Sequence, residues 1–226
     1  MKTVPLILAL FSTLAIQSTI ATFHYDQTRA QKGVYYSGAS YCAYETLKQW
    51  SCGTPCSWVP DITSTNQIVN TLRNTFVYTT YNRLDNEVIV VFRGTNGKDY
   101  MNWLTNSWGF KVEYEKGGNP NVKVHSGFKA AYDAVKDQML RDVMQQINEH
   151  SSASVFVTGH SLGGALAVLA ALDIKKAIGS RKIHLYTYGQ PRVGNSDFAD
   201  YVFSLLSGDQ YIRVVHYDDA IPHLPP

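Results

Sequence analysis

The stretch Val157-Thr-Gly-His-Ser-Leu-Gly-Gly164 decides the fold of this chain. It contains the pattern G-x-S-x-G, in which Gly159 and Gly163 flank Ser161. An apolar run precedes the pattern and an Ala/Leu-rich run follows it, which is the strand, turn and helix context that the pattern needs. The backbone of such a turn is strained and lifts the serine hydroxyl out of the sheet. The sequence therefore predicts that Ser161 is a nucleophile rather than an ordinary turn residue.

Strands and helices are expected to alternate around this turn. Apolar runs predict a hairpin over residues 76–92 and three further buried strands, at 154–158, 183–188 and 211–215. Apolar residues at helical spacing predict helices at 127–150, 162–178 and 198–206. This alternation predicts an α/β fold, in which helices flank a mostly parallel central sheet.

Composition excludes several classes of protein. Of the 226 residues, 45% are hydrophobic and 17% are charged, so the chain is not disordered and is long enough for one enzyme-sized domain. The formal net charge of +2 comes without a basic run, and we therefore expect no nucleic-acid partner. No His, Cys, Asp or Glu residues recur at metal-ligand spacing, so neither a metal nor another cofactor is expected.

Residues 1–21 have the features of a signal peptide. Lys2 supplies a positive charge, residues 5–16 are apolar, and the small residues Thr19 and Ala21 stand at the −3 and −1 sites. The apolar run is shorter than the roughly 20 residues that a transmembrane anchor requires. We expect cleavage after Ala21, secretion, and a single folded domain over residues 22–226.

Secretion makes disulfide bonds possible. Cys52 and Cys56 are separated by Gly-Thr-Pro, a turn-prone loop that predicts a local disulfide. Cys42 then has no partner, and a buried free thiol is one reading of it.

Two further segments supply the groups that a nucleophilic serine needs. Its tetrahedral intermediate requires N–H donors, commonly one from the residue after the serine and one from the loop after an earlier strand. Leu162 and Thr95, the last residue of Val91-Phe-Arg-Gly-Thr95, are the candidates for this oxyanion hole. The triad acid is expected after the last strand, where Asp218 and Asp219 cannot be distinguished by spacing.

These motifs together resemble the class 3 lipases, secreted fungal-type triacylglycerol lipases of the α/β-hydrolase superfamily. The matching segments are 91–95 with Asn102-Trp103, 124–128, 158–167, 188–195 and 219–226. The resemblance implies an α/β-hydrolase fold, Ser161 as nucleophile, Asp219 as triad acid, and Thr95 with Leu162 as oxyanion hole. It also implies hydrolysis of the carboxylic esters of acylglycerols.

The same resemblance implies a helical lid after the first oxyanion residue, over residues 96–110. One helical stripe of this segment is apolar and consists of Tyr100, Trp103, Leu104 and Trp108. An apolar stripe of this kind often packs in the hydrophobic core and has no other role. Its position beside the oxyanion segment instead favours a lid that opens toward a lipid–water interface, admits substrate and excludes water.

A general base is missing from this pattern. The histidine that follows Asp219 is His223, four residues later, and we do not expect one short loop to supply both groups. His160 precedes the nucleophile and is expected to point away from it. In the family that the chain resembles, the catalytic histidine comes well after the Leu-Pro-Pro segment, and a cysteine near the place of Cys42 pairs with one close to the C-terminus. We therefore expect the sequence to be truncated at its C-terminus and nearly inactive as it stands.

Three functions stay open at this point. The first is a secreted lipid-ester hydrolase. The second is a secreted, non-catalytic module of the same fold that binds a lipid or a partner. The third is another esterase, such as a phospholipase or a feruloyl esterase.

Overall fold

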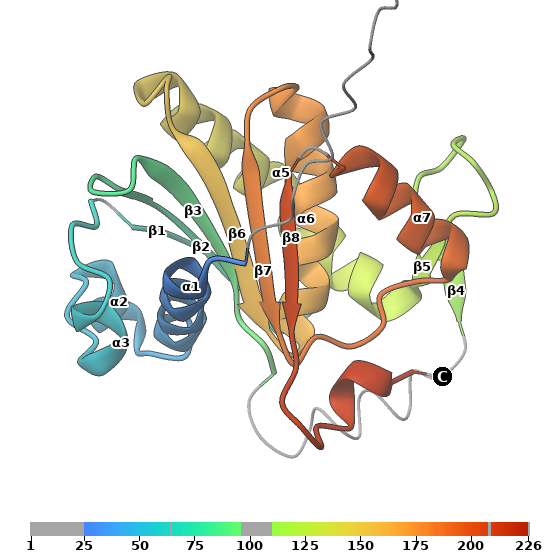
Figure 1. The fold of residues 1–226 in the computed structure, drawn as a ribbon, viewed down its shortest axis with the longest axis horizontal. Helices are drawn as coiled ribbons and strands as arrows, with labels where there is room; N and C mark the ends of the chain where they lie inside the picture. The colour runs from blue at the N-terminus through green and yellow to red at the C-terminus, as the bar shows by residue number, and fades with distance from the viewer. Residues whose placement is uncertain (1–24, 64, 96–109, 208, 226) are drawn as a thin grey trace, which may run out of the picture.

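A six-stranded sheet forms the centre of the molecule, with the strand order β1-β2-β3-β6-β7-β8 (Figure 1). The computed structural model describes residues 25–63, 65–95, 110–207 and 209–225. The strands are β1 Asn66–Asn70, β2 Thr75–Asn82, β3 Glu87–Phe92, β6 Ser154–His160, β7 Ile183–Tyr188 and β8 Gln210–Val214. The first three strands pair antiparallel, and β3, β6, β7 and β8 pair parallel. The predicted α/β fold with a mostly parallel sheet is confirmed.

The hairpin of β2 and β3 follows from its turn chemistry and its apolar strands. Asn86 has a φ of 53°, a conformation that asparagine tolerates better than most residues. Oδ1 of Asn82 accepts the N–H of Asp85 at 2.9 Å and closes the turn. Strand β3 is buried along its whole length, because Val88 and Val90 face one core cluster while Ile89 faces the other. An apolar run without polar alternation is the expected sequence of such a strand.

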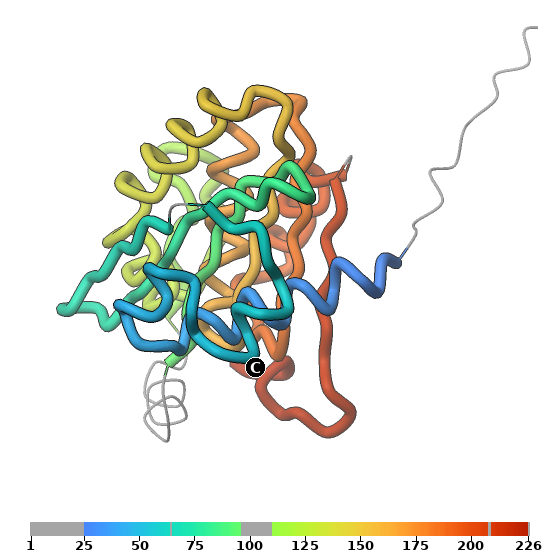
Figure 2. The backbone as a smooth tube through the Cα atoms, turned by 90° about the vertical axis from the view of Figure 1, so that its left-hand side faces the viewer, coloured from blue at the N-terminus to red at the C-terminus, as the bar shows by residue number. Residues whose placement is uncertain are grey.

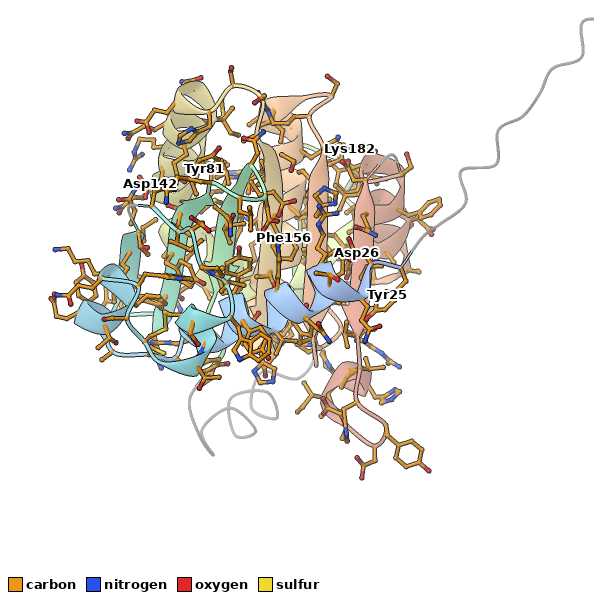
Figure 3. The ribbon with its side chains drawn as sticks, turned by 60° about the vertical axis from the view of Figure 1, so that its left-hand side comes forward. Tyr25, Asp26, Tyr81, Asp142, Phe156 and Lys182 are labelled. Atoms are coloured by element: carbon orange, nitrogen blue, oxygen red, sulfur yellow. A yellow bond between two sulfur atoms is a disulfide. The ribbon has the colours of Figure 1, made fainter. Side chains whose placement is uncertain are left out.

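Helices cover both faces of the sheet. Helices α5 (Ser126–Glu149), α6 (Leu162–Ile178) and α7 (Ser196–Leu205) contribute to one core cluster, together with one face of the central strands. Helix α1 (Gln27–Ala39) packs on the opposite face and joins a second cluster, near the short helices α2 (Tyr44–Lys48) and α3 (Thr54–Ser57) (Figures 1 and 2). Phe156 points from β6 toward α1, where its ring lies 5.8 Å from that of Tyr36 (Figure 3).

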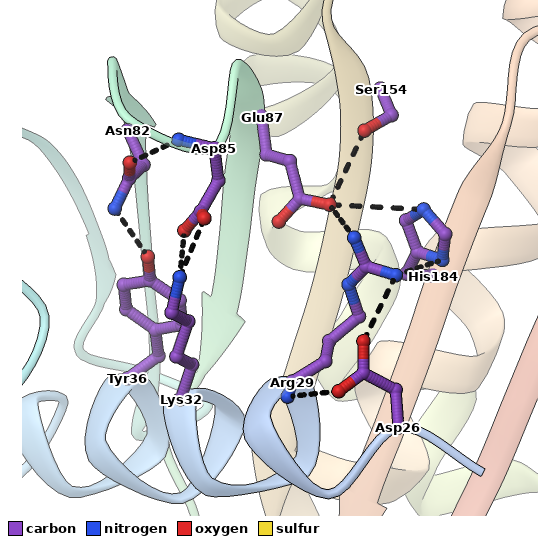
Figure 4. A network of polar contacts seen from close by, with 9 residues as sticks. All are labelled: Asp26, Arg29, Lys32, Tyr36, Asn82, Asp85, Glu87, Ser154 and His184. Atoms are coloured by element: carbon purple, nitrogen blue, oxygen red, sulfur yellow. Dashed lines mark hydrogen bonds and ion pairs between the residues drawn. The ribbon is translucent and has the colours of Figure 1, made fainter.

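Polar contacts at the amino ends of the strands hold the start of α1. Nη2 of Arg29 lies 3.1 Å from Oε1 of the buried Glu87 (Figure 4). The same carboxylate oxygen accepts a hydrogen bond from Ser154 at 3.3 Å and lies 3.7 Å from Nε2 of His184. Asp26 caps the helix by accepting the N–H of Arg29 at 2.9 Å. This network lies at the end of the sheet opposite to Ser161, because it gathers where β3, β6 and β7 begin.

Some elements are absent from the sequence-based prediction. They are α1, α2, α3, β1, the two-stranded sheet of β4 (Lys111–Glu113) and β5 (Lys123–His125), and the 3₁₀ turn η1 (Ile221–His223). The predicted disulfide between Cys52 and Cys56 is present, with 5.3 Å between the Cα atoms. Cys42 is a half-buried free thiol whose Sγ lies 3.7 Å from the carbonyl oxygen of Cys52. Within the described ranges, no helix is both long and apolar enough to cross a bilayer.

Candidate active site

Ser161 is a single residue with a strained backbone between a strand and a helix. Strand β6 ends at His160 and α6 begins at Leu162. Ser161 has φ 58° and ψ −127°, a backbone conformation that non-glycine residues rarely adopt. Its N–H donates to the carbonyl oxygen of Tyr188 at 2.8 Å, which ties the turn to the end of β7. The geometry is the strand, turn and helix arrangement that the sequence predicts, and the serine is only 8% exposed.

Glycines allow the backbone segments around Ser161 to approach one another. A Cβ added to Gly163 would lie 2.1 Å from the carbonyl oxygen of Phe92, at the end of β3. A Cβ added to Gly94 would lie 3.3 Å from Cβ of Ser161 and 2.7 Å from the carbonyl oxygen of His160. Side chains at these two positions would therefore push the exit of β3 away from the serine.

This close approach brings the two predicted oxyanion donors to one edge of the sheet. Thr95 directly follows Gly94, which lies against Ser161. Leu162 is the first residue of α6, and N–H groups in the first turn of a helix have no acceptor within the helix. The positive end of the helix dipole also favours negative charge at this place. The arrangement can stabilise an anion that forms next to Ser161.

The structure distinguishes the two adjacent carboxylates. Asp218 is solvated, with 82% of its side chain exposed and only a 3.6 Å contact to His216. Asp219 is half-buried, and its Oδ1 accepts the N–H of Ile221 at 2.9 Å. Its Oδ2 points toward the end of β7 and would lie 2.9 Å from a Cβ added to Gly189. Asp219 therefore lies near the Ser161 turn, which is bonded to Tyr188, and Asp218 does not.

Tyr41 is a member of the site that the sequence reasoning missed. Its hydroxyl accepts the N–H of Gly94 at 3.1 Å and lies 2.9 Å from Nδ1 of His160. Burial lowers the pKa of His160, and the charge of Asp219 opposes this shift in part. The lowered pKa favours the neutral imidazole, whose Nδ1 shares one hydrogen bond with the tyrosine hydroxyl. No local pattern signals this contact, because Tyr41 and His160 are 119 residues apart.

None of the described histidines is paired with Asp219. His223 is exposed in η1, and His160 is bonded to Tyr41. His125 has a structural role, since its Nδ1 accepts the N–H of Gly127 at 3.2 Å and so caps α5. Over the described ranges, neither a hydrogen bond nor an ion pair joins a histidine side chain to the carboxylate of Asp219.

The predicted lid lies outside the described residues. Its apolar stripe of Tyr100, Trp103, Leu104 and Trp108 falls within residues 96–109. Phe110, which follows directly, is 78% exposed. In the part of the chain that the structure covers, no three acidic, histidine or cysteine side chains are grouped to hold a metal ion.

Comparisons with known proteins agree with this geometry. Residues 89–226 match the family model described as lipase (class 3). A lipase of Rhizomucor miehei is 41% identical over 142 residues, which are 62% of this chain and 38% of that protein. A lipase of Rhizopus niveus is 34% identical over 205 residues, which are 87% of this chain and 50% of that protein. The chain thus spans half or less of the length of these two relatives.

Solved structures show the same fold. The triacylglyceride lipase of Rhizomucor miehei has a TM-score of 0.77 at 32% identity, covering 89% of this chain and 76% of that one. Lipase II from Rhizopus niveus has a TM-score of 0.76 at 31% identity, covering 90% of this chain and 77% of that one. These fungal lipases have the α/β-hydrolase fold, which confirms the fold expected from the sequence. On the match of its family model and of its fold, the chain belongs to the class 3 lipase family.

Proposed function

We propose that the protein is a carboxylic ester hydrolase that acts on acylglycerols, with Ser161 as its nucleophile. The observation that carries the proposal is the position of Ser161, at a positive φ and at the start of α6, against Gly94 and near Asp219. A serine on such a turn directs its hydroxyl away from the sheet, beside N–H groups that can bond a developing oxyanion. Thr95 and Leu162 are the proposed oxyanion donors, and Asp219 is the proposed triad acid.

The chemistry follows from these groups. Oγ of Ser161 attacks the ester carbonyl as a base takes its proton, and the oxyanion of the tetrahedral intermediate accepts N–H bonds from Thr95 and Leu162. Collapse of this intermediate releases the alcohol, here a glyceride hydroxyl, and leaves an acyl-serine ester. Water then attacks the acyl-enzyme by the same route and releases the fatty acid. Asp219 orients the base and stabilises its protonated form.

The names of relatives support the substrate class. A protein of Fusarium solani, named secreted mono- and diacylglycerol lipase 1, is 34% identical over 84% of this chain and 56% of that protein. A solved triacylglycerol lipase that is 33% identical is described as having a serine-protease triad as its catalytic centre. By analogy, we infer that this protein works at a lipid–water interface and that residues 96–110 form its lid.

We further infer that the protein is secreted and that its signal peptide ends at Ala21. Edman sequencing of the protein recovered from the culture medium is expected to begin at Thr22. A protein that stays in the cell, or one that keeps residues 1–21, would contradict this inference.

Turnover of emulsified substrate tests the activity. The complete product of the native gene, as distinct from residues 22–226 expressed by themselves, is expected to hydrolyse emulsified tributyrin and triolein and to bind a fluorophosphonate probe covalently at Ser161. The S161A variant should lose both properties. Binding of emulsion droplets without turnover or labelling would instead identify a non-catalytic lipid-binding module. This second function has one observation in its favour, namely that no described histidine pairs with Asp219. Faster turnover of phosphatidylcholine or of ethyl ferulate would indicate another esterase.

A further inference from the structure

Arg213 joins the end of strand β7 to the loop that carries Asp219. Nη2 of Arg213 lies 2.6 Å from the carbonyl oxygen of Gln190 and 2.7 Å from that of Pro222. Gln190 follows β7 directly after Gly189, and Pro222 belongs to η1, three residues beyond Asp219. One charged nitrogen therefore donates both to the segment that follows β7 and to the loop that carries Asp219.

The first of these acceptors is a fixed point of the molecule. Gln190 is 4% exposed, and its Oε1 accepts a hydrogen bond from the hydroxyl of Tyr211 at 2.9 Å. Its side chain also packs on the first turn of α6, where a Cβ added to Gly164 would lie 3.1 Å from Cβ of Gln190. Arg213 itself pairs with Thr187 in the parallel register of β7 and β8. The guanidinium thus extends from an exposed position on a strand of the sheet and bonds to the backbone of a buried residue.

The second acceptor belongs to a segment that has to be held in place. Residues 215–218 are exposed, so the chain leaves the sheet before it returns at Asp219. The Asp219 N–H bonds back to the His216 carbonyl oxygen at 3.1 Å, within the same loop, and therefore does not attach that loop to the sheet. Two hydrogen bonds attach the segment after Asp219 to the rest of the fold. Arg213 donates to the Pro222 carbonyl oxygen, and the Arg192 N–H donates to the Leu224 carbonyl oxygen at 2.7 Å.

We propose that Arg213 is a positioning residue for the triad acid, and this inference rests on the proposed function. By holding the carbonyl of Pro222, the guanidinium fixes η1, whose N–H at Ile221 bonds Oδ1 of Asp219 and leaves Oδ2 directed at Gly189. Hydrogen bonds from a charged donor are about twice as strong as neutral ones. Arginine stays charged throughout the working pH range, and its planar group directs two N–H bonds in fixed directions. Lysine supplies the charge without that geometry.

Steady-state kinetics of R213M, R213K and a control measure this role in the complete product of the native gene. Because small displacements of catalytic groups cost about 10²-fold in rate, R213M is expected to lower kcat about 10- to 100-fold with little change in KM. R213K should recover only part of the loss. The control is R83M. Arg83 lies in the turn between β2 and β3, and its guanidinium lies 3.1 Å from Oδ1 of Asp61. R83M should leave kcat unchanged, and melting curves must show that all three variants are folded at the assay temperature.

A double-mutant cycle with D219N separates positioning from a general structural effect. If Arg213 acts through Asp219, R213M lowers kcat in the parent protein and changes it less than about twofold in the D219N background, since coupled groups are not additive. Equal losses in both backgrounds would overturn the inference and leave the proposed function intact. A D219N variant with unchanged kcat would instead overturn the assignment of the triad acid and, with it, this role of Arg213.

Discussion

The hydroxyl of Tyr41 lies 2.9 Å from Nδ1 of His160 and also accepts the N–H of Gly94 at 3.1 Å. One side chain from the start of the chain thus connects the exit of β3 to the residue before the proposed nucleophile. Because Gly94 precedes Thr95, the hydroxyl also holds the backbone next to the second proposed oxyanion donor.

Removing this hydroxyl should impair catalysis more than folding. The Y41F variant leaves the part-buried N–H of Gly94 without its acceptor, which costs about 1 to 3 kcal/mol of stability. We expect kcat to fall about tenfold because the oxyanion segment is no longer fixed. The measurement is kcat and KM on a soluble ester, with Y44F as the control, since Tyr44 is 49% exposed. Equal kcat for Y41F and the parent protein would show that the contact has no role in the reaction.

The two adjacent carboxylates should differ widely in their effect on the rate. D219N keeps the shape of the side chain but cannot stabilise a protonated base, and losses of about 10⁴-fold in kcat accompany such changes in serine triads. D218N should stay within about twofold of the parent protein, since the side chain of Asp218 is 82% exposed. Initial rates of both variants on one ester decide the matter. A large loss with D218N and none with D219N would reverse the assignment.

Alanine should act in opposite directions at two glycines. In G163A the new Cβ would meet the backbone oxygen of Phe92 at 2.1 Å, and we expect a loss of about 3 kcal/mol or more. Gly38 lies inside α1, where an added Cβ would meet Pro55 at an ordinary 3.7 Å. G38A should therefore stabilise the protein by about 0.5 to 1 kcal/mol. Urea unfolding midpoints of the two variants test both signs.

Mild acid should weaken the attachment of α1. Burial, with the charge of Arg29, lowers the pKa of His184 to about 4 from the ordinary 6.5. The unfolded chain therefore binds more protons between these values, and the stability that His184 contributes is complete above pH 6.5 and is lost toward pH 4. Burial raises the pKa of Glu87, which acts in the opposite direction and offsets part of the loss.

A comparison of melting temperatures at pH 7.5 and pH 5 measures this effect. We expect the parent protein to lose about 2 to 4 °C for each kcal/mol that His184 contributes. The H184Q variant has no group that titrates here, so its melting temperature should change less between the two pH values. An equal change in both proteins would assign the acid sensitivity to other groups.

Residues 22–226 expressed by themselves are expected to be poor catalysts. No described histidine is paired with Asp219, and loss of the base from a serine triad costs on the order of 10⁶-fold in kcat. The oxyanion hole and substrate binding would leave a slow background rate. Stopped assays over hours, with S161A as the blank, measure that rate. Fast turnover that H223A abolishes would show that His223 is the base after all.

The elements around Ser161 could be predicted because their signals are local. A buried strand such as β3 is an unbroken apolar run, and the turn at Ser161 carries its glycines at fixed offsets. Helix α1 gives no such signal, since Gly33 and Gly38 lower its helix propensity and small residues make up part of its buried face.

The remaining members of the site depend on contacts between distant residues. The spacing after β8 does not distinguish Asp218 from Asp219, because the direction of each carboxylate depends on how the loop folds back through Pro222. The contact of Tyr41 with His160 arises only when the chain between them has folded. The proposal of Thr95 and Leu162 as oxyanion donors, in contrast, follows from the motifs directly and stays a prediction.

Gly33 and Tyr188 have a consequence for the evolution of the family. The hydroxyl of Tyr188 donates to the carbonyl of Ala30 in α1, and the carbonyl of Tyr188 accepts the N–H of Ser161. A Cβ on Gly33 would overlap that hydroxyl, so a larger residue at position 33 is compatible only with a shorter one at position 188. Homologous sequences should therefore vary at these two positions together, with alanine at 33 accompanied by phenylalanine or a smaller side chain at 188.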